Sequence, residues 1–389
     1  MKMNFKYAFV ALMMTCVGFT SCSDNDDPNT QPEQQVESAD VEYWQTNTAN
    51  WNNYMINVAT LLTKDASRLY QEWNDGANPY KITFTTTSDA FPTFRDIVIQ
   101  IIDGCVDIAN EVGVAKIGDP YNLYKEGRTV QALYAVESWY SYHSRQDYKN
   151  NIYSVQNAFF GNLSDENGNV TAAEKSIARF VETRNAALYQ KVKNAITDAA
   201  EAIWAIPDPF RNHIGDAKVL VAMEKCAELT SVLDEDLRTF ISSNINETEF
   251  QQIATQYVNA VVLPTYKSLT EKTVTLNNAI RAFAANPSNA GFEKACEAWL
   301  EARAPWETSE AFLFGPVADL GLDPNMDSWP LDQDAIVNIL KNGNFSALNW
   351  TGEYNEDDKA IETAQSVRGF HTLEFLLFKN GSPRRVAAE

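Results

Sequence analysis

Hydrophobic residues recur along most of the chain at intervals of three and four positions, the spacing that places them on one face of an α-helix. The clearest stripes comprise Phe94, Ile97, Val98, Ile101, Ile102, Cys105, Ile108, Ala109 and Val112, then Leu188, Val192, Ile196, Ala199, Ile203 and Ile206, then Leu229, Leu233, Leu237 and Ile241, and finally Leu269, Leu276, Ile280 and Phe283. Strand-like alternation is confined to residues 82–85, a stretch short enough to be a loop. Long helical stripes with short links predict an all-α fold built of helical bundles.

The length of the chain predicts two domains, because 389 residues exceed what one hydrophobic core usually serves. The polar stretch at residues 242–252 is the best boundary between them. We therefore expect one helical domain at residues 41–245 and a second at residues 250–389, each large enough to bury a core.

Residues 1–22 have the pattern of a processing segment. Two lysines precede an apolar stretch at residues 7–20, which is too short to cross a bilayer, and small residues lead up to Cys22. The run at residues 19–22 resembles a bacterial lipobox, in which the cysteine is lipidated. An ordinary cleaved signal peptide is the alternative.

Residues 23–40 are expected to form a polar, solvated tether. The run from Ser23 to Asp27 resembles the acidic tag on exported surface lipoproteins of Bacteroides-type bacteria. We therefore expect a protein attached by lipid to the outer membrane, facing the periplasm or the cell surface.

The chain is strongly acidic, with 52 Asp and Glu residues against 31 Lys and Arg residues and a net charge of −21. Loss of Lys2 and Lys6 with the leader would leave 29 basic residues and a net charge of −23. This charge argues against nucleic acid as a partner and suits a body held at a membrane by lipid alone. Three cysteines in apolar helical stretches are expected to be core residues rather than a disulfide framework: Cys105, Cys226 and Cys296.

The most unusual stretch lies at residues 369–378, where an apolar run is interrupted by His371, Thr372 and Glu374. On a helix His371 and Glu374 share one face. A segment that is apolar on every side is typical of a buried helix, so the Glu374 carboxylate must be protonated, meet a cation or line a wet cleft. The chain has only three histidines, which makes this pair the first candidate for a functional site.

A second charged stripe lies at residues 298–316 among several aromatic residues. Arg303, Glu307 and Glu310 follow one another at i, i+4 and i+7 and therefore share a helical face. Two interpretations remain open: a structural ion-pair network that offsets its own desolvation, or a charged stripe that faces the His–Glu pair across a cleft.

Residues 137–151 concentrate hydroxyl, aromatic and amide side chains, among them Ser141 and Asp147. Such side chains usually bond to local backbone and hold a loop in place, which is the favoured interpretation for any single one of them. The alternative is that the segment lends polar groups to a pocket.

Two metal-binding motifs are incomplete. Residues 323–327 imitate the start of a calcium-binding loop, but Ser328 and Asp334 stand where a glycine and a bidentate glutamate are required. The His–Glu pair near the C-terminus lacks the second histidine of the His-Glu-x-x-His zinc helix, so it supplies at most half of a zinc site.

Together these segments resemble the imelysin family, also called imelysin-like or iron-regulated-protein-A-like proteins. The family signature Gly-x-His-x-x-Glu is met by Gly369, His371 and Glu374. The other blocks, a Trp–Arg–aromatic–Glu–Phe run with a following Trp-Pro-Leu-Asp and a Glu-Ser-x-Tyr-Ser stretch, are met by residues 299–312, 329–332 and 137–151. The resemblance covers nearly all of the chain beyond the leader, and three blocks together make it specific.

The order of the blocks differs from that of the family, whose members have the Glu-Ser-x-Tyr-Ser block last. In this chain it comes first. The reversal predicts a circular permutation, which exposed and mutually close termini permit. We therefore expect Val41 and Pro383 to lie near each other, with residues 242–252 as the new joint.

The resemblance implies an all-α, imelysin-like fold of two helical-bundle domains, with the His–Glu helix lining a cleft between them. It also implies two functions to separate, because the family carries a metallopeptidase label and is associated with bacterial iron uptake. We expect His371 and Glu374 as metal ligands, with Glu307 or alternatively Glu310 as the third, and Arg303, Glu310, Trp329, Ser141 and Asp147 as further ligand-binding residues.

The residue types favour binding over catalysis. An open catalytic metal needs about three protein ligands and a base, but a motif places only one imidazole here, and Glu374 would have to be the catalytic residue. Oxygen ligands around a single histidine suit a hard cation or an iron-bearing ligand better than zinc. We therefore favour a lipoprotein that binds iron or another divalent or trivalent metal, with haem as a further candidate, over a metallopeptidase or a purely structural lipoprotein.

The charges also predict a geometry. Each charged pair lies in an apolar helix where it needs partners, so we expect Arg303 and Glu307 to converge in space with His371 and Glu374.

Overall fold

A computed structural model describes residues 41–165 and 167–388, so the expected leader, tether and lipidated Cys22 lie outside the described residues. Almost every described element is a helix, and the sheet is a single two-stranded hairpin of β1 (Phe378–Lys379) and β2 (Ser382–Pro383). The all-α prediction is confirmed. Within the described ranges, no helix is long and apolar enough to cross a membrane.

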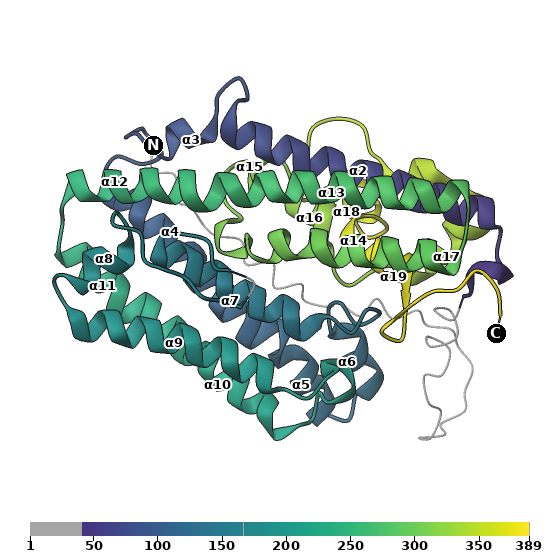
Figure 1. The fold of residues 1–389 in the computed structure, drawn as a ribbon, viewed down its shortest axis with the longest axis horizontal. Coiled ribbons are helices and arrows are strands. Elements are labelled where there is room, and N and C mark those ends of the chain that lie inside the picture. The colour runs from purple at the N-terminus through teal and green to yellow at the C-terminus, as the bar shows by residue number, and fades with distance from the viewer. Residues whose placement is uncertain (1–40, 166, 389) are drawn as a thin grey trace.

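One group of helices, across the top of Figure 1, is built around α2 and α13, which run side by side. Against them pack α14, α16, α17 and α19. The bounds in this group are η1 (Tyr43–Gln45), α2 (Thr48–Asn74), α3 (Tyr80–Thr83), α13 (Leu263–Ala285), α14 (Asn289–Glu307), η6 (Glu310–Phe312), α15 (Pro316–Asp319), α16 (Leu322–Asp327), α17 (Gln333–Asn342), η7 (Phe345–Leu348), α18 (Lys359–Gln365) and α19 (Gly369–Leu377).

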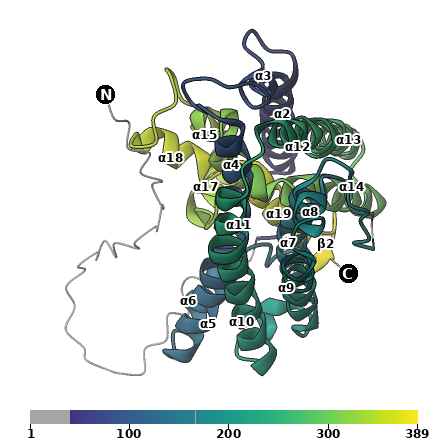
Figure 2. The same cartoon turned by 90° about the vertical axis from the view of Figure 1, so that its left-hand side faces the viewer.

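The other group lies below, with α9 and α10 at its outer side and α4 and α7 facing the first group (Figures 1 and 2). Its bounds are α4 (Phe94–Glu111), η2 (Val112–Lys116), α5 (Gly118–Lys125), α6 (Thr129–Ala135), α7 (Ser144–Phe160), α8 (Ile177–Glu182), α9 (Ala186–Ala205), η3 (Phe210–Asn212), α10 (Ala217–Ser231), η4 (Val232–Leu237) and α11 (Arg238–Ser243). The next elements, α12 (Glu247–Tyr257) and η5 (Val258–Val262), lie across the top of Figure 1, in line with α13.

A long rod joins the two groups. Helix α12 packs on α4 of the lower group, continues through the π-helical segment η5 and becomes α13, which packs on α2. The segments η2 and η4 are also π-helical. Such wider turns are rare inside α-helices and shift which side chains face the core.

The predicted hydrophobic stripes lie in the core. Residues 229, 233, 237 and 241 are all buried although they span α10, η4 and α11. Strict four-residue spacing drifts around a regular α-helix, and the wider π-helical turn of η4 keeps this stripe on one side. The stretch at residues 82–85 includes the end of α3, a single helical turn, rather than a strand.

Helix α2 buries Val58, Leu62, Leu69 and Trp73 and packs with α13, α16, α17 and α19. All four of those helices belong to the expected second domain, whereas α2 was assigned to the first. The bounds 41–245 and 250–389 thus do not follow the two helix groups, and the division into two domains stays a prediction.

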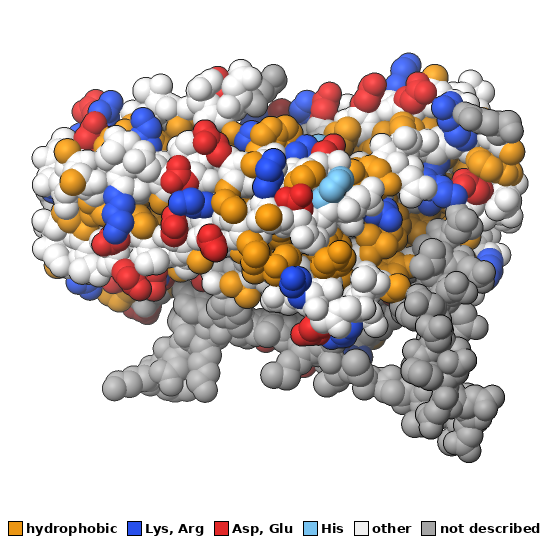
Figure 3. Space-filling model, turned by 90° about the horizontal axis from the view of Figure 1, so that it is seen from below, with side chains coloured by type: hydrophobic (Ala, Val, Ile, Leu, Met, Phe, Trp, Pro, Cys, Tyr) orange, Lys and Arg blue, Asp and Glu red, His pale blue; other side chains and the backbone are white. Residues whose placement is uncertain are grey.

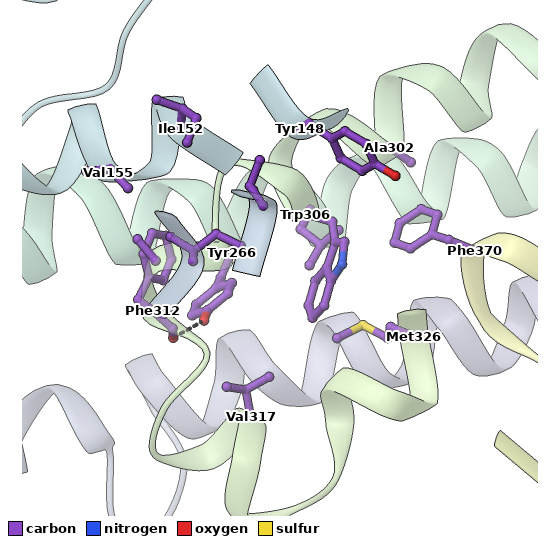
Figure 4. Close-up of a cluster of buried hydrophobic side chains, with 14 of the residues drawn as sticks. Tyr148, Ile152, Val155, Tyr266, Ala302, Trp306, Phe312, Val317, Met326 and Phe370 are labelled. Atoms are coloured by element: carbon purple, nitrogen blue, oxygen red, sulfur yellow. Dashed lines mark hydrogen bonds between the residues drawn. The ribbon is translucent and has the colours of Figure 1, made fainter. Parts of the chain in front are cut away.

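An apolar core fills the space where the two groups meet (Figure 4). Tyr148 and Ile152 of α7 lie across from Trp306 of α14 and Phe370 of α19, and the Tyr266 hydroxyl donates to the Phe312 carbonyl at 3.0 Å. Buried aromatic side chains of this size contribute much of the hydrophobic stabilisation and need a partner for each polar tip. This apolar core packs against the cluster of buried charged residues that forms the candidate functional site.

The two ends of the described chain meet. After α19 the chain turns through Asn380 and Gly381, both with left-handed φ, into the β1–β2 hairpin. Arg384 then donates from Nη1 to the carbonyl of Val41 at 2.6 Å. This closeness is what a circular permutation requires; the permutation itself stays a prediction.

Candidate functional site

Helix α19 begins with a glycine because no other residue fits there. Gly369 has a φ of +87°, and a Cβ atom at this position would lie 2.4 Å from the carbonyl oxygen of Met326. Every residue of α19 is buried. Its two ionisable side chains, His371 and Glu374, therefore meet partners inside the protein rather than solvent.

His371 lies between two carboxylates. Its Nδ1 is 3.1 Å from Oε2 of Glu374, and its Nε2 is 3.2 Å from Oδ1 of Asp327. Burial and the charge of Arg303 lower the pKa of His371, but the two carboxylates outweigh them and raise it to about 9. The ring is therefore protonated near neutral pH and donates from both nitrogens, which leaves no lone pair for a metal in that state.

Arg303, on α14, lies at the centre of the cluster and is fully buried. Its guanidinium contacts the carboxylates of Glu307 at 2.6 Å, Asp147 at 3.4 Å and Asp327. It also lies 3.4 Å from Nε2 of His371. The predicted convergence of Arg303 and Glu307 with His371 and Glu374 is thus confirmed, although their role in binding stays a prediction.

The loop between α6 and α7 holds Glu374 from the other side. Ser141 donates to Oε1 of Glu374 from its backbone N–H at 2.8 Å and from its hydroxyl at 2.7 Å. Ser138 and Tyr142 in this loop have positive φ values of 50° and 64°, which are costly for residues other than glycine. The loop therefore holds strained backbone where Ser141 meets Glu374.

Helix α7 supplies a second set of contacts from the lower group. Asp147 accepts from the Ser138 hydroxyl at 2.5 Å and pairs with Arg303. Asn151 donates from Nδ2 to Oε2 of Glu307 at 2.5 Å. The Glu-Ser-x-Tyr-Ser block thus contributes to the same buried group of charges as the other two blocks. We call this group the centre; its core is formed by Arg303, Glu307, Asp327, His371 and Glu374.

Three carboxylates form a tight group beside this network. One oxygen each from Glu307, Glu310 and Asp327 lies within 4.8 Å of the others, a geometry that could hold a metal ion. Burial raises the pKa of Glu307 to about 8 and that of Glu310 well above its usual range. Burial acts on Asp327 in the same direction, but the charges of Arg303 and His371 hold its pKa well below the usual range.

Lys116 brings a second buried cation into the same region. Its Nζ lies 3.1 Å from Oε2 of Glu137 and 3.9 Å from Oε1 of Glu111. Burial lowers the pKa of Lys116, but the charges of Glu137 and Glu310, among others, raise it overall, so the ammonium stays charged. Its position in the π-helical segment η2 turns it inward.

The sequence missed two members of this centre. Asp327 lies in the stretch that we set aside as an incomplete calcium loop, and it proves to be the carboxylate that joins Arg303 to His371. Its closeness in sequence to the Trp-Pro-Leu-Asp block was the available signal. Lys116 had no signal, because nothing in the sequence marks η2 as a π-helical segment.

Two further expectations need correction or restriction. The His–Glu helix does not line an open cleft, because His371, Glu374, Arg303 and Glu307 all have 0% exposure. Trp329 is half-buried, with its ring centroid 4.8 Å from that of His371, so it lies at the border of the centre. The three cysteines expected in the core are free and buried.

The chain is similar to known proteins over most of its length. A family model described as imelysin, peptidase family M75, matches residues 25–235 and 262–388. An imelysin peptidase from Bacteroides ovatus, known from a crystal structure, is 53% identical with a TM-score of 0.86, and the match covers 90% of this chain and 100% of that one.

A shorter match links the chain to an iron-related protein. Iron-regulated protein A of Synechococcus elongatus is 34% identical over 127 residues, which make up 33% of this chain and 31% of that relative. The match thus spans about a third of the relative's length. From the family model and the crystal structure together, we conclude that the chain belongs to the imelysin family.

Proposed function

We propose that this protein is a lipid-anchored bacterial lipoprotein that binds iron, or another hard metal cation, in iron uptake. The observation that carries the proposal is the group of oxygens from Glu307, Glu310 and Asp327 within 4.8 Å of one another. Carboxylate oxygens are the ligands that hard cations prefer.

The charges of the centre support a cation. Glu307 and Glu310 are buried acids whose raised pKa values show that their charged forms lack sufficient compensation. Arg303 and Lys116 offset only part of the acidic charge. Buried carboxylates of this kind hold either protons or a metal, so metal binding should release protons and strengthen from pH 6 to pH 9.

The proposed ligand set differs from the one suggested by the sequence. Glu307 is retained, whereas Glu310 and Asp327 take the places of His371 and Glu374, so that all three proposed donors are carboxylate oxygens. His371 acts on the metal indirectly, because its protonated ring fixes the Asp327 carboxylate. It would become a ligand only after losing its proton.

The similarity to Iron-regulated protein A supports iron as the metal. Anaerobic calorimetric titration with Fe²⁺, together with elemental analysis of the purified protein, tests the proposal. We expect Glu310→Gln to weaken Fe²⁺ binding at least about tenfold. Glu301→Gln is the matched control, since Glu301 lies on α14, close to Glu310 in the sequence, but is exposed and pairs with Lys272. Equal binding by wild type, Glu310→Gln and the double variant His371→Ala, Glu374→Ala would refute the proposal.

The imelysin-type metallopeptidase is the second candidate, favoured by the similarity to a protein named an imelysin peptidase. Its catalytic residue would be Glu374, whose Oε1 already accepts two bonds from Ser141. Degradation of unfolded casein by the wild type, lost in Glu374→Gln, would support this alternative. If the protein neither binds metal nor cleaves casein, the remaining candidate is a purely structural lipoprotein.

Attachment to the outer membrane through Cys22 belongs to the same proposal. Its support is the lipobox-like run at residues 19–22. Cys22→Ser should move the protein from the membrane fraction to the soluble fraction of cells. Unchanged membrane association would contradict lipid attachment at this residue.

A further inference from the structure

Arg211 is a half-buried arginine beside which no acid lies among the residues that the structure describes. Within residues 41–165 and 167–388, every other arginine that is at least half-buried pairs with a carboxylate: Arg95, Arg145, Arg238, Arg303, Arg368 and Arg384. No described carboxylate lies within ion-pair distance of Arg211. A guanidinium taken out of water without a counter-ion is costly, so its position calls for an explanation.

The contacts of Arg211 hold it in place without neutralising it. Its Nη1 donates to the carbonyl of Trp139 at 3.0 Å, and its guanidinium stacks over the Trp139 ring at 4.1 Å. Its Nε is buried and has no hydrogen-bond partner among the described residues. Burial lowers the pKa of Arg211, with Glu374 and the tyrosines Tyr134, Tyr140 and Tyr142 as the groups that act against this.

None of these groups satisfies the guanidinium. Glu374 is engaged by Ser141 and His371, and it lies beyond ion-pair distance of the guanidinium. Arg211 therefore presents a positive charge that no described carboxylate neutralises.

Arg211 lines a pocket of about 270 Å³ between the α5–α6 region and the loop before α10. The other lining residues are Tyr124, Thr129, Leu133, Asn212, Ile214 and Gly215. This volume lies at the small end of the range for ligand pockets, roughly 300–1,000 Å³. On the face seen in Figure 3, hydrophobic side chains gather beside exposed basic and acidic ones.

The walls of the pocket are anchored. In the loop before α10, Phe210 is buried and His213 donates from Nδ1 to the carbonyl of Pro209 at 2.9 Å. The Tyr124 ring lies against Gly215, where a Cβ atom would come within 2.3 Å of it. A preformed pocket with a fixed cation needs little reorganisation to bind a ligand.

We propose that this pocket binds a small carboxylate, with the carboxylate against the guanidinium of Arg211 and an aliphatic body against Leu133 and Ile214. The planar guanidinium fork matches a carboxylate, and its single charge matches a monoanionic group. A phosphate would carry more charge than one arginine offsets, on a chain whose net charge is already −21.

The pocket adjoins the buried centre through one loop. Trp139, which accepts from and stacks on Arg211, lies two residues before Ser141, which binds Glu374. The carboxylate site does not depend on a metal in that centre, so the two proposals can fail separately.

Calorimetric titration of the metal-free protein, in buffer without carboxylates or phosphate, tests the inference. The probes are the monoanions acetate, propionate, butyrate and valerate, with butyramide and inorganic phosphate for comparison. We expect at least one of the four carboxylates to bind and the amide not to bind. Arg211→Gln should weaken that binding at least about tenfold, because it removes a charge-assisted hydrogen bond.

Arg145→Gln is the matched control. Arg145 is also half-buried and stacks on an aromatic ring, that of Trp204 at 4.6 Å, but it pairs with Asp208 and does not line the pocket. The affinity of the Arg145→Gln variant for the carboxylate should stay within about twofold of that of the wild type. Arg211→Lys, which keeps the charge but loses the fork, provides a second variant if Arg211→Gln does not fold, and should also bind more weakly.

Three results would overturn the inference. The first is that no carboxylate binds at concentrations up to about 20 mM. The second is that Arg211→Gln, or Arg211→Lys in its place, binds the carboxylate as tightly as the wild type. The third is that phosphate or butyramide binds as tightly as the best carboxylate, since a carboxylate site should discriminate against both.

Discussion

Arg303 is the side chain on which the buried charges of the centre depend most. It is fully buried and contacts Glu307, Asp147 and Asp327. Methionine is a long, unbranched side chain like arginine but carries no charge, so this replacement leaves three buried acidic side chains without their shared cation. Because removing one partner of a buried ion pair costs about 3–5 kcal/mol, we expect Arg303→Met to lose about that much free energy of unfolding in urea denaturation.

The matched control for this prediction is Arg281→Met. Arg281 is exposed on α13, and its guanidinium donates to Asn277 and Thr60 rather than to a buried acid. Its loss should change the free energy of unfolding by no more than about 0.5 kcal/mol. Equal stabilities for the two variants would show that the buried network contributes no more than a surface contact.

The pKa of His371 predicts how stability depends on pH. Folding raises this pKa from 6.5 to about 9, so the native state holds the proton more tightly than the unfolded state. The stabilisation is complete below pH 6.5 and is lost as the pH rises through 9. The difference corresponds to roughly 3 kcal/mol.

Glu307 acts in the same direction, since its pKa rises from 4.5 to about 8 on folding. We therefore expect the free energy of unfolding to fall between pH 4.5 and pH 9, and to fall less steeply above pH 6.5 in His371→Gln. Urea denaturation at several pH values measures both slopes. A wild-type profile that is flat over this range would contradict the protonated state of His371.

At the scale of elements, the start of α19 depends on Gly369. An alanine there would adopt a φ of +87° and place its Cβ atom 2.4 Å from the Met326 carbonyl oxygen. Gly352 provides the control, because it also has a positive φ, +99°, but a Cβ atom there would meet nothing within 4 Å.

The comparison of the two alanine variants separates backbone strain from the clash. Left-handed backbone costs about 1–3 kcal/mol at either position, and the clash adds to this only at Gly369. We expect Gly369→Ala to be destabilised by at least about 2 kcal/mol more than Gly352→Ala in thermal or urea unfolding. Equal losses would mean that Met326 moves aside easily.

Helix positions were well predicted because burial imposes a period that the sequence displays. The stripe of α4 and that of α9 are buried almost throughout. Where a helix changes type, sequence spacing no longer tells which residues share a face. The spacing of Arg303, Glu307 and Glu310 predicts a single helical face, but α14 ends at Glu307 and Glu310 lies on the 3₁₀ turn η6. The three side chains still converge, because η6 turns back over the same centre.

At the scale of the whole molecule, the centre combines residues from η2, α7, α14, η6, α16 and α19. The sequence predicted the convergence of two charged pairs, because buried charges require partners. It did not predict that Asp327 would join them, since α16 has only six residues and shows no clear period. Such a centre is defined by packing between distant segments, which no local pattern records.

The meeting of the chain ends makes a further prediction about the whole molecule. Arg384 donates to the Val41 carbonyl, so residues 388 and 41 can be joined by a linker of about six Gly and Ser residues. New ends can be opened between Asn244 and Ile245, in the short link between α11 and α12, where Ile245 is 56% exposed. Exposed loops of this kind tolerate such changes, so we expect the permuted protein to fold with unchanged helix content.

A second permuted protein, opened between Leu276 and Asn277 within α13, is the control. It carries the same linker, but its cut interrupts the helix that packs on both α2 and α14, and Leu276 is fully buried. Circular dichroism and urea denaturation should show a loss of no more than about 2 kcal/mol in the first protein and no cooperative unfolding in the second. If the first protein fails to fold, the natural order of the chain segments is required for folding. Closeness of the two chain ends would then not be sufficient for a permuted chain to fold.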